Sequence, residues 1–165
     1  MRSSNSWELD RGPFWFLERC LDAIAKEAPV AYRLVVRALG GRAIAITIGE
    51  EIATLAMASG EHRIARDAGS GCAVELALTD AVISRLLEGR CTVLDAVLGG
   101  DLVLRGSADD LAALHDALLA FIHGAVRSPS TPSLLESYLD RDVSPNSANA
   151  SPGANHGERH GPSQR

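Results

Sequence analysis

The spacing of apolar residues between positions 13 and 39 predicts two successive helices. From Pro13 to Ala28 the apolar residues recur at intervals of three and four, and Pro13 suits the first turn of a helix. Pro29 interrupts the pattern, and a second apolar stripe extends over 30–39. Gly40-Gly41 then predicts the end of this helix, because glycine readily adopts the left-handed conformation that closes helices.

After residue 42 the apolar period changes to two, which predicts strands. Isoleucines alternate with smaller residues over 44–48, Gly49-Glu50 suits a tight turn, and the return strand is expected over 51–58. A third and more polar strand over 62–67 suits the edge of a sheet. A flexible glycine-rich connection leads to a fourth strand over 72–78.

From Thr79 onward the pattern predicts a helix, a short helix, a strand and a long helix. Thr79 can cap a helix that stops at Glu88-Gly89, and Thr92 with Asp95 has the form of a capping box. A short strand is expected over 101–106, followed by a helix from Ser107 to about 126. A Ser/Pro-rich hinge and a short amphipathic helix, over 132–139, complete the series.

This order of elements resembles the C-terminal half of the sterol carrier protein family of lipid-binding domains. The resemblance is carried by Leu76-Ala77-Leu78-Thr79-Asp80, by Leu86-Leu87-Glu88-Gly89-Arg90, by the glycine-bounded strand at 100–106, and by the leucine-rich helix after it. The upstream segment from Leu21 to Asp67 is similar to the family's helix followed by antiparallel strands. Two departures are Val97-Leu98-Gly99, where family members often have aromatic residues, and Asp101, where lysine is frequent.

The resemblance implies an α+β fold in which a mostly antiparallel sheet of about five strands is covered on one face by helices. An apolar tunnel between the two layers would hold a lipid. Each residue expected to line it is equally well explained as ordinary core. These residues are Leu86, Leu87, Val93, Leu94, Val97, Leu98, Leu102, Leu104, Leu114, Leu118 and Phe121.

The function that this resemblance implies is the non-catalytic binding or transfer of a sterol-like, fatty acyl or isoprenoid lipid. The alternative is an accessory subunit that presents a hydrophobic intermediate to partner biosynthetic enzymes, or a scaffold whose cavity has filled. Phe14, Trp15 and Phe16 bear on this choice, because three adjacent aromatic residues cannot all enter one core from one helix. Either one or two of them pack inward, or they form an edge that touches a protein partner or a membrane.

Length and composition predict one domain with flexible ends. The 165 residues divide into a flexible N-terminus (1–12), the lipid-binding domain (13–127), a hinge with a short helix (128–141) and a tail (142–165) whose polar composition predicts disorder. Aromatic residues make up only 4%, so the core must be aliphatic. A net charge of -5 without a basic cluster argues against nucleic acid as a partner.

The chemistry-bearing residues give no catalytic or cofactor motif. Cys20, Cys72 and Cys91 form no C-x-x-C pair and suggest buried, reduced cysteines of a cytoplasmic protein, and no apolar run reaches the length of a membrane span. His115 and His123 are too far apart along their helix to share a metal, and solvent-facing positions are expected for both. We therefore expect neither an enzyme nor a metal site.

Overall fold

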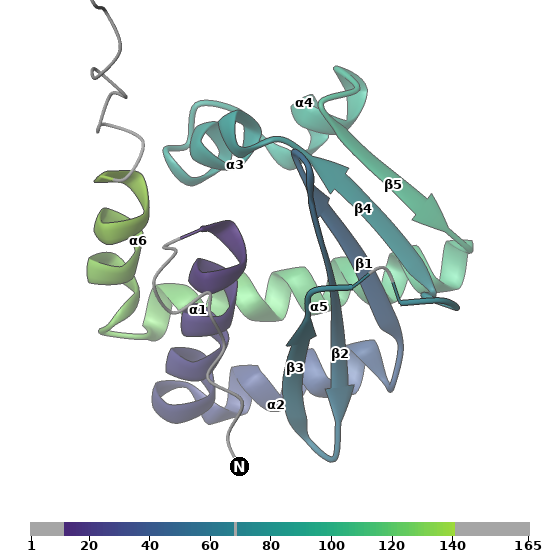
Figure 1. The fold of residues 1–165 in the computed structure, drawn as a ribbon. Coiled ribbons are helices and arrows are strands. Elements are labelled where there is room, and N and C mark those ends of the chain that lie inside the picture. The colour runs from purple at the N-terminus through teal and green to yellow at the C-terminus, as the bar shows by residue number, and fades with distance from the viewer. Residues whose placement is uncertain (1–11, 68, 141–165) are drawn as a thin grey trace, which may run out of the picture.

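The fold is α+β and consists of one five-stranded sheet with helices packed against it (Figure 1). A computed structural model describes residues 12–67 and 69–140. Along the chain come α1 (Pro13–Glu27), α2 (Pro29–Leu39), β1 (Ala43–Ile48), β2 (Glu51–Ala58), β3 (Glu61–Ala65), β4 (Val74–Leu78), α3 (Asp80–Leu87), α4 (Val93–Leu98), β5 (Leu102–Gly106), α5 (Ala108–Arg127) and α6 (Thr131–Leu139).

The strands lie in the order β3-β2-β1-β4-β5, and every neighbouring pair is antiparallel except β1 with β4. The first three strands follow one another through tight turns, which antiparallel pairing allows. β4 then returns beside β1, with Ile46 opposite Leu76. The predicted mostly antiparallel sheet is confirmed, and the expected edge position of the third strand is correct.

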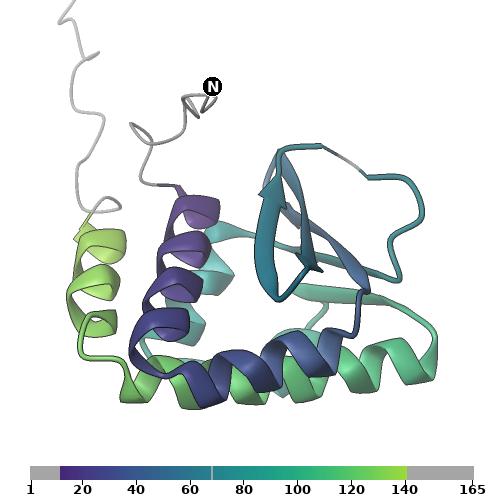
Figure 2. The same ribbon diagram turned by 90° about the horizontal axis from the view of Figure 1, so that it is seen from below.

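The sheet is covered by helices on one face, where α2 and α5 lie side by side beneath it (Figure 2). The alternation of β1 explains this arrangement, because Ile44, Ile46 and Ile48 are buried while the residues between them are only half-buried. β2 repeats the pattern with Ala53 and Leu55. The two-residue period read from the sequence therefore distinguishes the helix-facing side of the sheet from its outer side.

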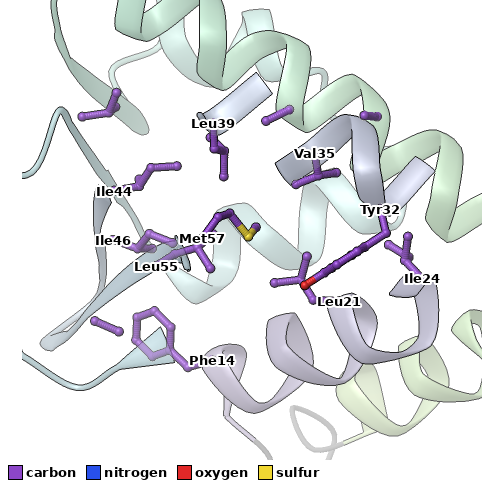
Figure 3. Close-up of a cluster of buried hydrophobic side chains, with 14 of the residues drawn as sticks. Phe14, Leu21, Ile24, Tyr32, Val35, Leu39, Ile44, Ile46, Leu55 and Met57 are labelled. Atoms are coloured by element: carbon purple, nitrogen blue, oxygen red, sulfur yellow. The ribbon is translucent and has the colours of Figure 1, made fainter. Parts of the chain in front are cut away.

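The main core lies between this sheet face and helices α1, α2 and α5 (Figure 3). It is almost entirely aliphatic, as the composition requires, with Phe14 and Tyr32 as its buried aromatic members. A second, smaller cluster of Val82, Ala96 and Leu102 lies where α3, α4 and β5 meet. Ala96 is therefore the residue of α4 that anchors this short helix.

The aromatic residues at the start of α1 separate into different environments. Phe14 is buried in the main core, so it is not part of an exposed edge. Phe16 stacks on Tyr138 of α6, with ring centroids 4.6 Å apart, and Tyr138 is completely buried. The helix expected after the hinge is therefore docked on α1, and only Trp15 remains a half-buried candidate for an outside contact.

Several boundaries differ from the expected ones. The third strand ends at Ala65 instead of residue 67, and the fourth begins at Val74 because Cys72 and Ala73 belong to the preceding loop. The flexible N-terminus expected before Gly12 and the tail expected from residue 142 lie outside the described residues. Of the cysteines, Cys20 alone is buried, whereas Cys72 and Cys91 are only partly covered, so the prediction of three buried thiols is wrong for these two.

Candidate functional site

A cavity of about 280 Å³ lies between the helix-facing side of the sheet and the surrounding helices. All twenty residues that line it are apolar, so a molecule inside would meet hydrocarbon in every direction. The lining comprises Pro13, Phe16, Leu17, Leu21, Val35, Leu39, Ile44, Ile46, Ile48, Leu55, Leu76, Leu78, Ile83, Leu86, Val93, Leu102, Leu114, Ala117, Leu118 and Phe121.

Regular secondary structure places these side chains around a common space. β1 presents Ile44, Ile46 and Ile48 to the cavity because alternate residues of a strand share a face. Leu17 and Leu21 of α1 lie four residues apart and therefore point to the same side of that helix. The cavity is thus held by rigid elements.

Six of the eleven residues expected to line a tunnel lie in the cavity wall. They are Leu86, Val93, Leu102, Leu114, Leu118 and Phe121. Leu104 packs instead against the small cluster under α3 and α4. Leu87 at the end of α3 is exposed, and so are Leu94, Val97 and Leu98 of α4, because α4 turns Ala96 toward the protein and Val93 toward the cavity.

Two residues of the cavity wall are exposed. Val93 of α4 is 40% exposed and Leu118 of α5 is 37% exposed, although both line the cavity. We infer that solvent reaches the cavity wall between these two residues, and we call this place the mouth of the cavity.

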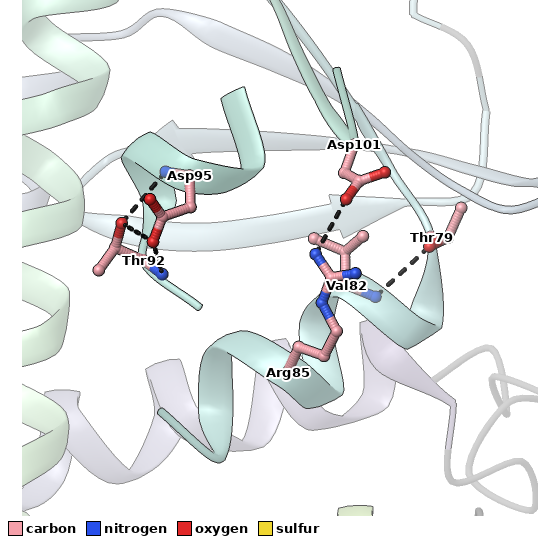
Figure 4. Close-up of polar contacts among 6 residues, drawn as sticks. All are labelled: Thr79, Val82, Arg85, Thr92, Asp95 and Asp101. Atoms are coloured by element: carbon pink, nitrogen blue, oxygen red, sulfur yellow. Dashed lines mark hydrogen bonds and ion pairs between the residues drawn. The ribbon is translucent and has the colours of Figure 1, made fainter. Parts of the chain in front are cut away.

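Polar interactions near the mouth hold the short elements that frame it, without entering the cavity (Figure 4). Thr79 accepts a hydrogen bond from the backbone N–H of Val82 and caps α3. At α4, the Thr92 hydroxyl donates to Asp95 Oδ2 at 2.7 Å, and the backbone N–H of Thr92 donates to the same oxygen at 3.0 Å. These two hydrogen bonds lower the pKa of Asp95, since they favour its charged form.

An ion pair joins α3 to the start of β5. Arg85 Nη2 lies 2.9 Å from Asp101 Oδ2, and this hydrogen bond is the main reason that the pKa of Arg85 is raised. The Asp101 carboxylate thereby connects the residue that precedes β5 to the helix that precedes α4. The capping box thus stabilises the start of α4, and the Arg85–Asp101 ion pair holds the segment that follows α4.

Sequence reasoning missed the part of the wall that α1, α2 and the inner strands contribute. Leu21, Leu39, Ile44 and Ile46 all carry the periodicity of buried residues, and that signal is correct. Periodicity indicates that a side chain faces inward, but it does not distinguish a side chain packed against another from one that borders a void. The other fourteen wall residues were therefore not among those expected to line a tunnel.

The titratable groups of the described residues lie away from the cavity wall. Among these residues no group of three His, Cys, Asp or Glu side chains is placed to hold a metal ion. Cys20 is the buried thiol, and its burial raises its pKa to about 12, which keeps it protonated. His115 and His123 are both exposed, as expected.

None of the helices that the structure describes is long and apolar enough to span a bilayer.

The sequence matches no protein-family model and no curated protein sequence. Solved structures do match. The sterol carrier protein domain 2 of Helicoverpa armigera is 14% identical, with a TM-score of 0.52 over 73% of this chain and 95% of that domain. A Thermus thermophilus protein described as possibly a sterol carrier protein is 19% identical, with a TM-score of 0.46 over 73% of this chain and 92% of that one.

A larger enzyme also contains a similar region. The inverting sec-alkylsulfatase of a Pseudomonas species is 15% identical over 52% of this chain, with a TM-score of 0.41, and this chain covers only 14% of its length. The match to the Helicoverpa armigera domain shows that this chain has the fold of the sterol carrier protein domains. The resemblance read from the sequence is confirmed at the level of the fold, which is what identities this low can establish.

Proposed function

We propose that this protein binds the apolar tail of a lipid in its cavity and releases it chemically unchanged. The observation that supports this proposal is the cavity itself, about 280 Å³ in volume and lined by apolar side chains alone. Such a wall excludes polar ligands, because a buried polar group without a hydrogen-bond partner costs several kcal/mol. A hydrocarbon chain has no such requirement.

The size of the cavity favours one segment of a fatty acyl or isoprenoid tail over a whole sterol. An engineered apolar cavity of about 150 Å³ is known to hold benzene, which has six carbon atoms. A cavity of about 280 Å³ is nearly twice as large and should hold roughly a dozen carbons. A sterol has more than twice that number of carbons, so it would not fit completely inside.

The position of the mouth determines where the head group would lie. Only the tail can be placed against the apolar wall, so the polar end must remain between α4 and α5, where Val93 and Leu118 meet solvent. Each buried CH₂ contributes about 0.8 kcal/mol before the costs of ordering. Affinity should therefore follow tail length, whereas the chemistry of the head group should have little effect.

The carrier role has more support than an accessory role in a biosynthetic assembly. An aromatic edge at the start of α1 and the extra helix α6 would favour an accessory role, but Phe14 is buried and Phe16 is stacked on Tyr138 of α6, so these features pack against each other. Binding is also favoured over catalysis, since no nucleophile, acid or base faces the cavity from the part of the chain that the structure describes.

Displacement of a fluorescent fatty acid by saturated fatty acids of increasing length tests the proposal. We expect affinity to rise with each added carbon and to level off at about twelve, when the cavity is full. Absence of uptake at every length, by protein shown to be folded, would refute it. A sterol that competes as strongly as the best fatty acid would contradict the size argument.

A filling substitution locates the binding site without adding charge. Ala117 is buried in the cavity wall, so Ala117→Leu should occupy part of the volume and shift the optimum to shorter tails. Ala112→Leu is the matched control, because Ala112 lies exposed on the same helix and does not border the cavity. If the two variants have the same chain-length profile, the tail binds somewhere else.

A further inference from the structure

Six aliphatic side chains continue the cavity wall onto the surface around the mouth. Val93, Leu94, Val97 and Leu98 of α4 and Leu118 and Ile122 of α5 are all exposed, and we call this set the mouth rim. Leu94 is 65% exposed and Leu98 is 77% exposed. Exposed apolar side chains that gather in one patch are typical of an interaction site.

Helical geometry makes the mouth rim continuous with the cavity. On α4, Ala96 faces the protein and Val93 faces the cavity, so Val97, Leu94 and Leu98 follow in order around the helix toward solvent. On α5, Leu118 borders the cavity and Ile122 lies one turn further along the same side. An apolar path therefore leads from the interior to the surface.

Most charged side chains on the elements around the mouth rim have a hydrogen-bonding or ion-pairing partner. Arg85 pairs with Asp101, Arg90 with Glu88, and Asp95 accepts hydrogen bonds from Thr92. On α5, His115 Nδ1 lies 3.5 Å from Asp116 Oδ1. The mouth rim thus offers no cluster of cations to attract an anionic surface, and its border suits a surface without net charge.

We propose that the mouth rim docks onto a zwitterionic lipid bilayer and inserts its aliphatic side chains between the head groups. This inference rests on the proposed function, since a tail that leaves a bilayer for the cavity must pass through the mouth. Docking at the rim would join the cavity to the acyl region of the bilayer. The tail would then exchange without crossing water.

The composition of the mouth rim favours a bilayer over a protein partner. Protein interfaces are enriched in tyrosine, tryptophan and arginine, and they typically form about one hydrogen bond per 100–200 Å². The mouth rim contains only Val, Leu and Ile side chains, which have no hydrogen-bonding groups. Its chemistry matches that of acyl chains.

Flotation with phosphatidylcholine vesicles tests the docking surface. We expect wild-type protein to bind these vesicles about equally in low and high salt, and Leu94→Glu/Leu98→Glu to reduce the bound fraction at least tenfold. Val30→Glu is the matched control, because Val30 on α2 is 64% exposed and lies outside the mouth rim. The control should bind within twofold of wild type.

Three outcomes would overturn the proposal. The first is a wild-type protein that does not bind phosphatidylcholine vesicles, and the second is a rim variant that binds them normally. The third is binding that requires anionic lipid and is lost in high salt or in the double variant Arg33→Glu/Arg37→Glu. That result would place the membrane contact on the face of α2 that carries these two arginines. A wild-type dimer that the rim variant converts to monomer, without vesicle binding, would assign the surface to a second copy.

Uptake of a free fluorescent fatty acid without vesicles separates this inference from the proposed function. Leu94 and Leu98 do not border the cavity, so the rim variant should take up the probe as wild type does. Uptake without vesicle binding refutes the docking surface alone. Absence of uptake by the wild type refutes the proposed function, whatever the vesicles show.

Discussion

Gly124→Ala should destabilise this protein, although glycine to alanine usually stabilises a helix. Gly124 is buried on α5 at the point where α5 meets α1 and α2. A Cβ atom there would lie 2.6 Å from Ile24 Cγ2 and 3.1 Å from Ala31 Cβ. The first distance is well inside van der Waals contact, so one of the helices must move.

Two opposing contributions set the magnitude. In an exposed helix, alanine is more favourable than glycine by about 0.8–1 kcal/mol. Extra volume in a packed core costs about 1–3 kcal/mol, and the upper part of this range applies because Ile24 is fully buried and its β-branched side chain is stiff. We expect a net loss of about 1–2 kcal/mol in the free energy of unfolding.

Urea denaturation followed by far-UV circular dichroism measures this loss, and a double-mutant cycle identifies its cause. In the Ile24→Ala background the clashing Cγ2 atom is absent, so adding Gly124→Ala should cost little or even stabilise. Ala112→Gly, on the exposed face of α5, gives the helix-propensity contribution separately. A stabilised Gly124→Ala, or a penalty of the same size in both backgrounds, would refute the packing argument.

Two further predictions concern the α1–α6 junction and the thiols. Glu27 accepts hydrogen bonds from the Ser128 and Ser130 hydroxyls and from the Ser130 backbone N–H. These hydrogen bonds lower the pKa of Glu27. The stabilising contribution of Glu27 is therefore present above the ordinary glutamate pKa and is lost as the pH falls through the lowered pKa. Glu27→Gln should therefore lower the Tm at neutral pH and converge with wild type in acid; a gap that widens in acid contradicts this. Iodoacetamide should modify Cys72 and Cys91 in the native protein but not Cys20, whose burial raises the pKa of its thiol to about 12. Mass spectrometry of the alkylated protein measures which cysteines react. Modification of Cys20 ahead of the other two would contradict this prediction.

The sequence alone determined the elements and the inner face of the sheet. The alternation of Ile44, Ile46 and Ile48 fixes which side of β1 is buried, because a strand has only two faces. Thr79, Thr92 and Ser107 fixed the starts of three helices, since each accepts a hydrogen bond from a backbone N–H that the helix leaves unpaired. These features depend on residues close together in the sequence, so the local residue pattern is enough to predict them.

Only the tertiary structure decided which apolar residues border the cavity and which face solvent. Val93 and Leu94 are neighbours with similar side chains, yet the first lines the cavity and the second lies on the surface. The difference arises because Ala96 anchors α4 against Val82 and Leu102, residues distant in sequence, and so fixes the rotation of the helix. A void is the space that several elements together leave unfilled, and no residue pattern within one element encodes it.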